Sequence, residues 1–66
     1  MKTKYQAGDI VCTMRDAETV DMYSLVMKIE LMENDYLYTF YDLGVNAYAY
    51  LLARYIDSNP RIKKVA

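Results

Sequence analysis

Histidine and tryptophan are absent from this 66-residue chain, and cysteine and proline each occur once. Without histidine, the chain lacks the side chain that most often serves as a general base and as a metal ligand. One cysteine cannot form a disulfide within the chain, although secreted domains of this length usually depend on such bonds. No glycine-rich phosphate loop, paired-cysteine zinc motif or serine nucleophile elbow occurs. These absences predict that the protein is not an enzyme and uses no metal or cofactor.

Long apolar runs are missing too. No segment approaches the roughly 18 consecutive apolar residues of a membrane-spanning helix. No apolar stretch follows the charged residues at the start of the chain, as it would in a signal peptide. With the single cysteine, this pattern predicts no contact with a membrane and a location in the cytoplasm.

Apolar and aromatic residues, in contrast, are abundant. Hydrophobic residues make up 55% of the chain, which has eight tyrosines and five methionines. That content is too apolar for a disordered chain, and the length suits a single domain spanning residues 1–66. A domain so small cannot bury all of these side chains. Some tyrosines must therefore lie on the surface or against a partner, and a homo-oligomer is one expected outcome.

Charge is distributed unevenly along the chain. Residues 9–57 carry three basic side chains against nine acidic ones, a net charge of −6. The basic residues gather at the two ends, as Lys2, Lys4, Arg61, Lys63 and Lys64. Tight nucleic-acid binding needs several basic groups acting together on phosphates. The acidic body therefore argues against nucleic acid as a partner and against a positively charged groove.

Alternating apolar and polar residues predict several short strands. The clearest spans residues 23–31, where every odd position is apolar and the even positions are mostly polar. We expect its odd face to be buried. Strands are also expected over residues 9–15 and, after a turn at residues 33–35, over residues 36–43, whose two faces both carry bulky side chains. The expected buried face of the clearest strand is Tyr23, Leu25, Met27, Ile29 and Leu31.

Residues 46–56 fit two descriptions. Their alanines and leucines favour a helix that Asn46 would cap. Tyr48 and Tyr50, which alternate with small or aliphatic residues, favour a strand to about residue 51 and then a short helical turn near residues 52–56. We prefer the strand. A turn at residues 57–60 and a last strand over residues 61–65 complete the pattern, and lysines there would protect a sheet edge.

The order of these segments resembles the small SH3-like barrels found among short bacterial and phage proteins. The resemblance rests on three pieces: Tyr5 to Val11, with Gly-Asp before two aliphatic residues; Leu25 to Ile29; and the aromatic strand from Tyr38 to Asp42. It also includes a helical turn at residues 54–56 before the last strand. The resemblance implies an all-β, SH3-like barrel of about five short antiparallel strands. It also implies a phage or bacterial source, which would place the protein in the host cytoplasm if a phage encodes it.

Two groups of residues are the candidate binding site. We expect the aromatic side chains of two paired strands to form one patch that contacts a partner. Asp16, Glu18 and Asp21 lie close together in the loop after the first expected strand. We expect them to form a solvated acidic surface, because the glycine and terminal glutamate of a calcium-binding loop are missing. Cys12, inside an apolar strand, is expected to be a buried hydrophobic residue. The site residues are Tyr36, Tyr38, Phe40, Tyr48, Tyr50, Asp16, Glu18 and Asp21.

The function that these features favour is non-catalytic binding. The leading prediction is a small protein-interaction accessory protein that pairs with itself, or with a host or virion protein, through the tyrosine-rich sheet face and the acidic loop. The alternative is a weak single-stranded nucleic acid or RNA binder, which would stack bases on tyrosine and use the basic termini. A purely structural subunit of a larger assembly is a third reading.

Overall fold

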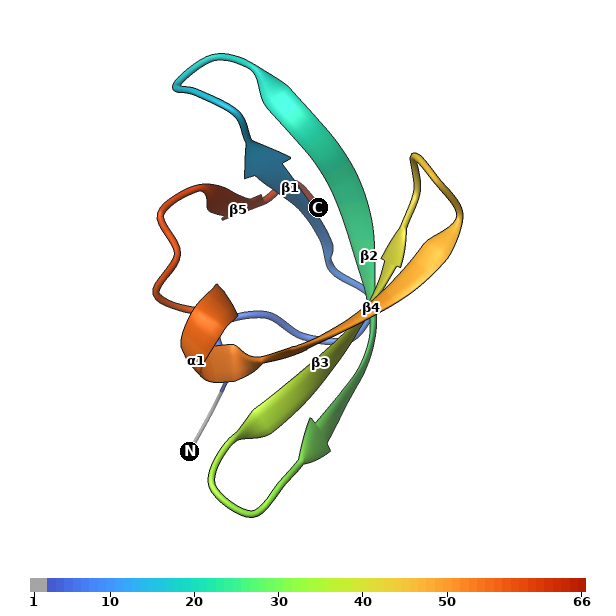
Figure 1. The fold of residues 1–66 in the computed structure, drawn as a ribbon, viewed down its shortest axis with the longest axis vertical. Coiled ribbons are helices and arrows are strands. Elements are labelled where there is room, and N and C mark those ends of the chain that lie inside the picture. Colours follow the sequence, from blue (N-terminus) through green and yellow to red (C-terminus); the bar gives the residue numbers. More distant parts are fainter. Residues whose placement is uncertain (1–2) are drawn as a thin grey trace.

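The computed structural model describes residues 3–66, so that Lys2, one of the predicted basic residues, lies outside the described part. The elements are β1 (Ile10–Met14), β2 (Val20–Leu31), β3 (Tyr36–Asp42), β4 (Ala47–Leu52), α1 (Ala53–Ile56) and β5 (Ile62–Lys64). All neighbouring strands are antiparallel and form one sheet in the order β4-β3-β2-β1-β5. The sheet is strongly curled, and β4 leads directly into α1 (Figure 1). β4 and β5 are therefore its two edges.

This architecture confirms the predicted all-β class, with five antiparallel strands and a helical turn before the last one. The strand over residues 47–52 also confirms the preferred description of that segment over the helical one. Within residues 3–66, no helix has the length and apolar character needed to cross a membrane.

The core lies on one face of the sheet, here called the inner face. Side chains from the N-terminal segment, from β1, β2 and β3, and from α1 and β5 meet there. Tyr38 is fully buried, and its ring centroid lies 5.3 Å from that of Phe40 and 6.2 Å from that of Tyr5. The buried apolar cluster is Tyr5, Val11, Val26, Tyr38, Phe40, Ala53, Ile56 and Ile62. Cys12 is also buried, as its place in the strand predicted.

Hydrogen bonds of the Tyr5 and Tyr38 hydroxyl groups connect distant parts of this core. The Tyr5 hydroxyl donates to the carbonyl of Ile62 (3.0 Å), and the Tyr5 N–H donates to the Tyr38 hydroxyl (3.1 Å). The Tyr38 hydroxyl donates in turn to the Asp57 carboxylate (2.6 Å). Burial, followed by this bond to Asp57, raises the pKa of Tyr38 to about 12. These bonds connect β3 to β5 through the N-terminal segment. Strand pairing does not connect them, because β3 and β5 are not neighbours in the sheet.

The buried face of β2 differs from the predicted one. Ser24 and Val26 are buried, whereas Tyr23 and Met27 are exposed and Leu31 is 74% exposed. A β-bulge explains the difference: Val26 pairs with Phe40, but Lys28 rather than Met27 pairs with Thr39.

One extra residue in a strand moves the following side chains to the opposite face. Even positions of β2 therefore point inward before the bulge, and Ile29 packs against the core after it. The prediction of a strand is confirmed. The prediction that all of its odd positions are buried is wrong, and Leu25 and Ile29 are only half-buried.

The turn between β3 and β4 sets which side chains share a face. Asp42 pairs with Ala47, which leaves four residues in the turn. Asn46 adopts a left-handed conformation with φ of 56°, which asparagine tolerates better than most residues, and its N–H donates to the Asp42 carbonyl (2.9 Å). The Asp42 carboxylate accepts the N–H of Gly44 (2.8 Å). This turn places Tyr41 opposite Tyr48.

Candidate interaction surface

Four tyrosines lie on the side of the sheet opposite the core. Tyr41 pairs directly with Tyr48, and Leu25 of β2 pairs with Tyr41 on its other side. Tyr23 and Tyr50 lie two residues from Leu25 and Tyr48 and so share their face, because side chains alternate along a strand. We call Tyr23, Tyr41, Tyr48 and Tyr50 the outer tyrosine face.

Part of this surface is held in place before any partner arrives. The rings of Tyr41 and Tyr48 meet edge to face, with centroids 5.1 Å apart and planes at 60°. The Tyr41 hydroxyl donates to the side-chain oxygen of Asn46 (3.0 Å). Tyr48 and Tyr50 nevertheless remain 57% and 63% exposed. Ordered yet exposed rings lose little conformational entropy on binding, which is why tyrosine is common at protein interfaces.

The predicted aromatic patch is only partly correct. Tyr48 and Tyr50 are exposed, but they lie on the outer face with Tyr41, whereas Tyr38 and Phe40 are buried in the core and Tyr36 packs against it. The two groups are on opposite sides because Tyr38 pairs with Leu51 rather than with Tyr48 or Tyr50. A single patch containing all five residues is therefore wrong.

Two of the three predicted acids, Asp16 in the β1–β2 loop and Asp21 at the start of β2, make local contacts. The Asp16 carboxylate accepts the N–H groups of Glu18 and Thr19, both at 2.9 Å. These bonds hold the pKa of Asp16 below its usual value. Asp21 forms an ion pair with Arg15 (2.9 Å). Within residues 3–66, the structure shows no group of three or more aspartate, glutamate, cysteine or histidine side chains that could hold a metal ion.

The basic residues near the C-terminus and two tyrosines of the outer tyrosine face lie at opposite edges of the sheet. Arg61, Lys63 and Lys64 belong to or border β5, whereas Tyr48 and Tyr50 lie on β4. Three strands separate these edges in the sheet order. On the tyrosine side, Lys28 pairs with Glu30 (3.6 Å). Lys63 shares a cross-strand row with Tyr23 through Cys12, so the β5 lysines border the Tyr23 end of the outer tyrosine face and not its Tyr48 and Tyr50 end.

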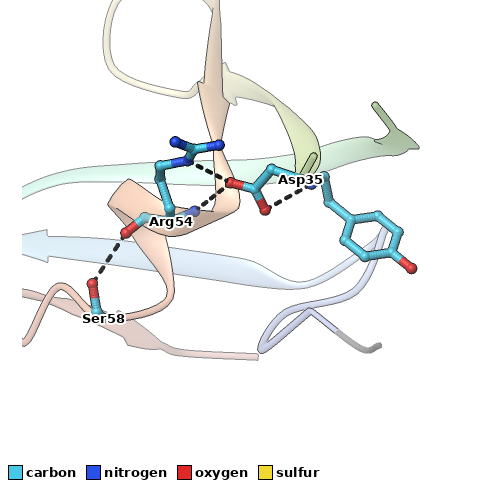
Figure 2. A network of polar contacts seen from close by, with 4 residues as sticks. Asp35, Arg54 and Ser58 are labelled. Carbon is cyan, nitrogen blue, oxygen red and sulfur yellow. Dashed lines mark hydrogen bonds and ion pairs between the residues drawn. The ribbon is translucent and has the colours of Figure 1, made fainter. Parts of the chain in front are cut away.

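A hollow of about 310 Å³ with mostly polar residues in its lining lies beside α1, and the contacts of these residues support the fold. The Asp35 carboxylate, only 10% exposed, accepts the backbone N–H and the Nε–H of Arg54 at 2.9 and 3.2 Å (Figure 2). It also accepts the N–H of Tyr36 (2.8 Å). The Arg54 N–H, followed by that of Tyr36, lowers the pKa of Asp35. These bonds fix the β2–β3 turn to the first turn of the helix.

A second hollow, of about 140 Å³, opens on the inner face. It is mostly apolar and is lined by residues of β1, β2, β3 and β4 together with Ile56 of α1 and Ile62 of β5. Its walls include Phe40 and Val11 of the core.

A scan of the sequence against protein-family models found no matching family, and searches of curated proteins and of solved structures found no match either. The resemblance to SH3-like barrels therefore remains a prediction. Function has to be argued from the surface itself.

Three residues of this surface, Tyr23, Tyr41 and Thr39, were not among the predicted site residues. Tyr41 was predicted to lie in a strand but was not chosen as a site residue. The observed register pairs it with Tyr48. Thr39 is buried on the outer face between Lys28 and Tyr50, its partners across the strands. Its hydroxyl has no hydrogen-bond partner in the part of the chain that the structure describes. The pairing of β3 with β2 and β4, and not the sequence, shows that Thr39 lies between Lys28 and Tyr50.

Proposed function

We propose that this protein is a non-catalytic interaction module that binds another protein through its outer tyrosine face. The observation that carries this proposal is the exposure of Tyr48 and Tyr50 beside the ordered Tyr41 ring. Large aromatic side chains held in water are costly unless a partner covers them, and such clusters mark interaction sites.

The net charge of the chain supports a partner with basic residues. The body of the chain, residues 9–57, has a net charge of −6. An acidic protein associates faster with a basic partner and disfavours acidic ones. The separation of the β5 lysines from Tyr48 and Tyr50 favours a protein over single-stranded nucleic acid, because base stacking is usually combined with a positive groove.

The test compares the capture of partners by matched variants. The native chain, a Tyr48→Ala, Tyr50→Ala double variant and a Tyr55→Ala control are immobilised and exposed to lysate of the source cells. Tyr55 lies on α1 away from the face and is 62% exposed, which makes it a matched tyrosine. We expect at least one protein to be retained by the native chain and the control but lost by the double variant.

A captured protein supports the proposal only if it binds directly. The purified protein should bind the native chain in a calorimetric titration, with affinity lowered roughly 100-fold or more by the double variant, as for interface hot spots. Two results would contradict the proposal: equal capture by all three chains, or salt-sensitive binding of a labelled single-stranded oligonucleotide that the double variant abolishes.

A further inference from the structure

β4 is an edge strand without the usual protection against pairing. Its six residues, Ala-Tyr-Ala-Tyr-Leu-Leu, include no charge, proline or glycine, and all but the last are exposed. An edge strand presents unpaired N–H and C=O groups, and natural proteins usually block such edges with lysine, proline, bulges or short length. Antiparallel pairing continues without a register shift from Asp42 to Leu37 along its other side. The open side of β4 is therefore ready to accept another strand.

We propose that β4 pairs with β4 of a second copy of this chain, antiparallel and about a two-fold axis. The two five-stranded sheets would then form one continuous sheet. Such an interface is isologous, so that each copy offers the same residues to the other. Self-pairing does not depend on the protein partner proposed above.

The residues of β4 favour a second copy as the occupant. The strand carries no charge, and Arg54, two residues beyond Leu52, is already paired with Asp35 of its own chain. Pairing of two such strands therefore buries no unpaired charge. Tyr48 and Tyr50 flank Ala49 symmetrically, so that the strand is complementary to itself.

The hydrogen bonds of β3 show which backbone groups of β4 point outward. The Leu43 N–H donates to the Tyr23 carbonyl (3.0 Å), so odd positions around β3 bond toward β2. Even positions then bond toward β4, because backbone groups of a strand point alternately to its two sides. Their partners in the register are Leu51, Ala49 and Ala47. The open side of β4 is therefore formed by the backbone groups of Tyr48, Tyr50 and Leu52.

Pairing through these outward groups allows few registers. The one that we propose places the two-fold axis at Ala49, so that Ala49 lies opposite Ala49 of the second copy. Tyr48 then lies opposite Tyr50 of the second copy, and Tyr50 opposite Tyr48. Two aromatic cross-strand pairs stabilise this register, and the small alanines allow close approach on the inner face. An axis at Tyr50 would form one aromatic pair and place Leu51 against Ala49.

The proposed dimer changes the outer tyrosine face. Tyr48 and Tyr50 of both copies would form one continuous row across the axis, with Tyr41 of each copy beside it. A partner would then meet a surface to which both copies contribute. The dimer itself is expected to be weak, because five paired residues give a small interface.

Sedimentation equilibrium of the native chain tests the dimer first. Between about 10 and 500 µM, a range suited to small interfaces, the average mass should rise from 7.7 kDa toward twice that value. A mass of 7.7 kDa over the whole range would overturn the proposal, even if the chain still captures a foreign protein.

Cysteine cross-linking tests the register. In a Cys12→Ala background, Ala49→Cys should form a disulfide-linked dimer under mild oxidation, because Cα atoms of a non-hydrogen-bonded antiparallel pair lie about 4.5 Å apart, within disulfide range. Ala47→Cys is the matched control. In this register the two Cα atoms at position 47 are separated by about four residue steps, or roughly 13 Å, which is too far. A dimer that Ala49→Cys does not cross-link, or that Ala47→Cys cross-links equally well, contradicts the register.

A charge at the axis should weaken the dimer without removing a tyrosine. Ala49→Lys places two like charges opposite each other, and we expect the dissociation constant to rise roughly tenfold or more. Ala17→Lys adds the same charge in the exposed β1–β2 loop and should leave association unchanged. Circular dichroism of both variants verifies that the monomer remains folded. Equal association of Ala49→Lys and the native chain would count against β4 as the interface.

Discussion

The two edges of the sheet differ in almost every property that governs strand pairing. β5 has three residues, of which two are lysines, and it begins with the buried Ile62. The Arg61 side chain donates to the Met14 carbonyl (2.8 Å), and the Tyr5 hydroxyl donates to the Ile62 carbonyl. β4 is twice as long, uncharged and exposed on both faces. One edge is anchored to the core and closed to pairing, and the other is open.

This difference divides the molecule into a part that supports the fold and a part that is available for binding. Changes at β5 should reduce stability, whereas changes at the exposed positions of β4 should mainly affect association. Each variant below tests one side of that division.

Ile62→Ala should have the largest effect. Ile62 is buried in the core cluster, and truncating a buried isoleucine costs about 2–4 kcal/mol because a cavity remains. Leu51→Ala in β4 is the matched control; Leu51 is 42% exposed, and we expect a loss of about 1 kcal/mol. Urea unfolding followed by circular dichroism measures both. Equal losses would remove the distinction between the edges.

Tyr38→Phe should have the next largest effect, because it removes the hydroxyl that joins β3 to the N-terminal segment and Asp57. The Tyr5 N–H and the Asp57 carboxylate then lose a bond, for about 1–3 kcal/mol. Tyr55→Phe, on an exposed side chain, is the control.

Tyr38 should also make stability depend on alkaline pH. Its pKa is about 12 in the fold and 10.0 without the fold. The fold therefore favours the neutral hydroxyl, and this contribution is fully present below pH 10 and is lost as the pH rises toward 12. Urea midpoints across this range should fall more steeply for the native chain than for Tyr38→Phe. Parallel slopes would show that Tyr38 does not carry the effect.

Asp35→Asn should have a smaller effect on stability. It alters the contact between the β2–β3 turn and the start of α1. The Arg54 and Tyr36 N–H groups hold the pKa of Asp35 below its model-peptide value of 3.8, so the carboxylate stabilises the fold above that pH. The contribution is lost as the pH falls through the lowered pKa. The variant should therefore have a lower thermal midpoint at pH 7 and a weaker decline in acid. An unchanged midpoint would mean that this contact does not fix the start of α1.

Lys64→Ala should have the smallest effect. Lys64 pairs with Asp9 at 3.5 Å, and its side chain is largely exposed. Such a pair contributes about 0–1 kcal/mol, and salt screens it. Urea unfolding at low and high salt should show a small loss that disappears at high salt. A loss as large as that of Ile62→Ala would mean that the charge, and not the buried isoleucine, holds this edge.

The sequence was sufficient to predict the strands and the helical turn because alternation and turn residues are local signals. It was misleading about β2, where Leu25 and Met27 are apolar although they lie on the outer face or at the bulge. A bulge depends on the partner strand, so the sequence of one strand does not reveal it.

The prediction of which residues form the candidate site was partly wrong for a similar reason. Whether Tyr48 meets Tyr38 or Tyr41 depends on the number of residues in the β3–β4 turn and on the left-handed Asn46. The exposure of Tyr48 and Tyr50 agrees with the expectation that some tyrosines lie on the surface. The link from Tyr5 through Tyr38 to Asp57 spans distant parts of the chain, and no local pattern indicates it.

The unsatisfied hydroxyl of Thr39 makes the outer surface locally frustrated. A methyl group in its place, as in Thr39→Val, would remove a buried polar atom without a partner and should leave the isolated chain as stable or more stable. A position that is not optimal for the isolated molecule is typical of sites shaped by something other than folding. Thr39 lies directly beside Tyr50, so this unfavourable position falls within the proposed contact surface. The energetic imperfection of the isolated chain and the exposed tyrosines then coincide at one place on the sheet.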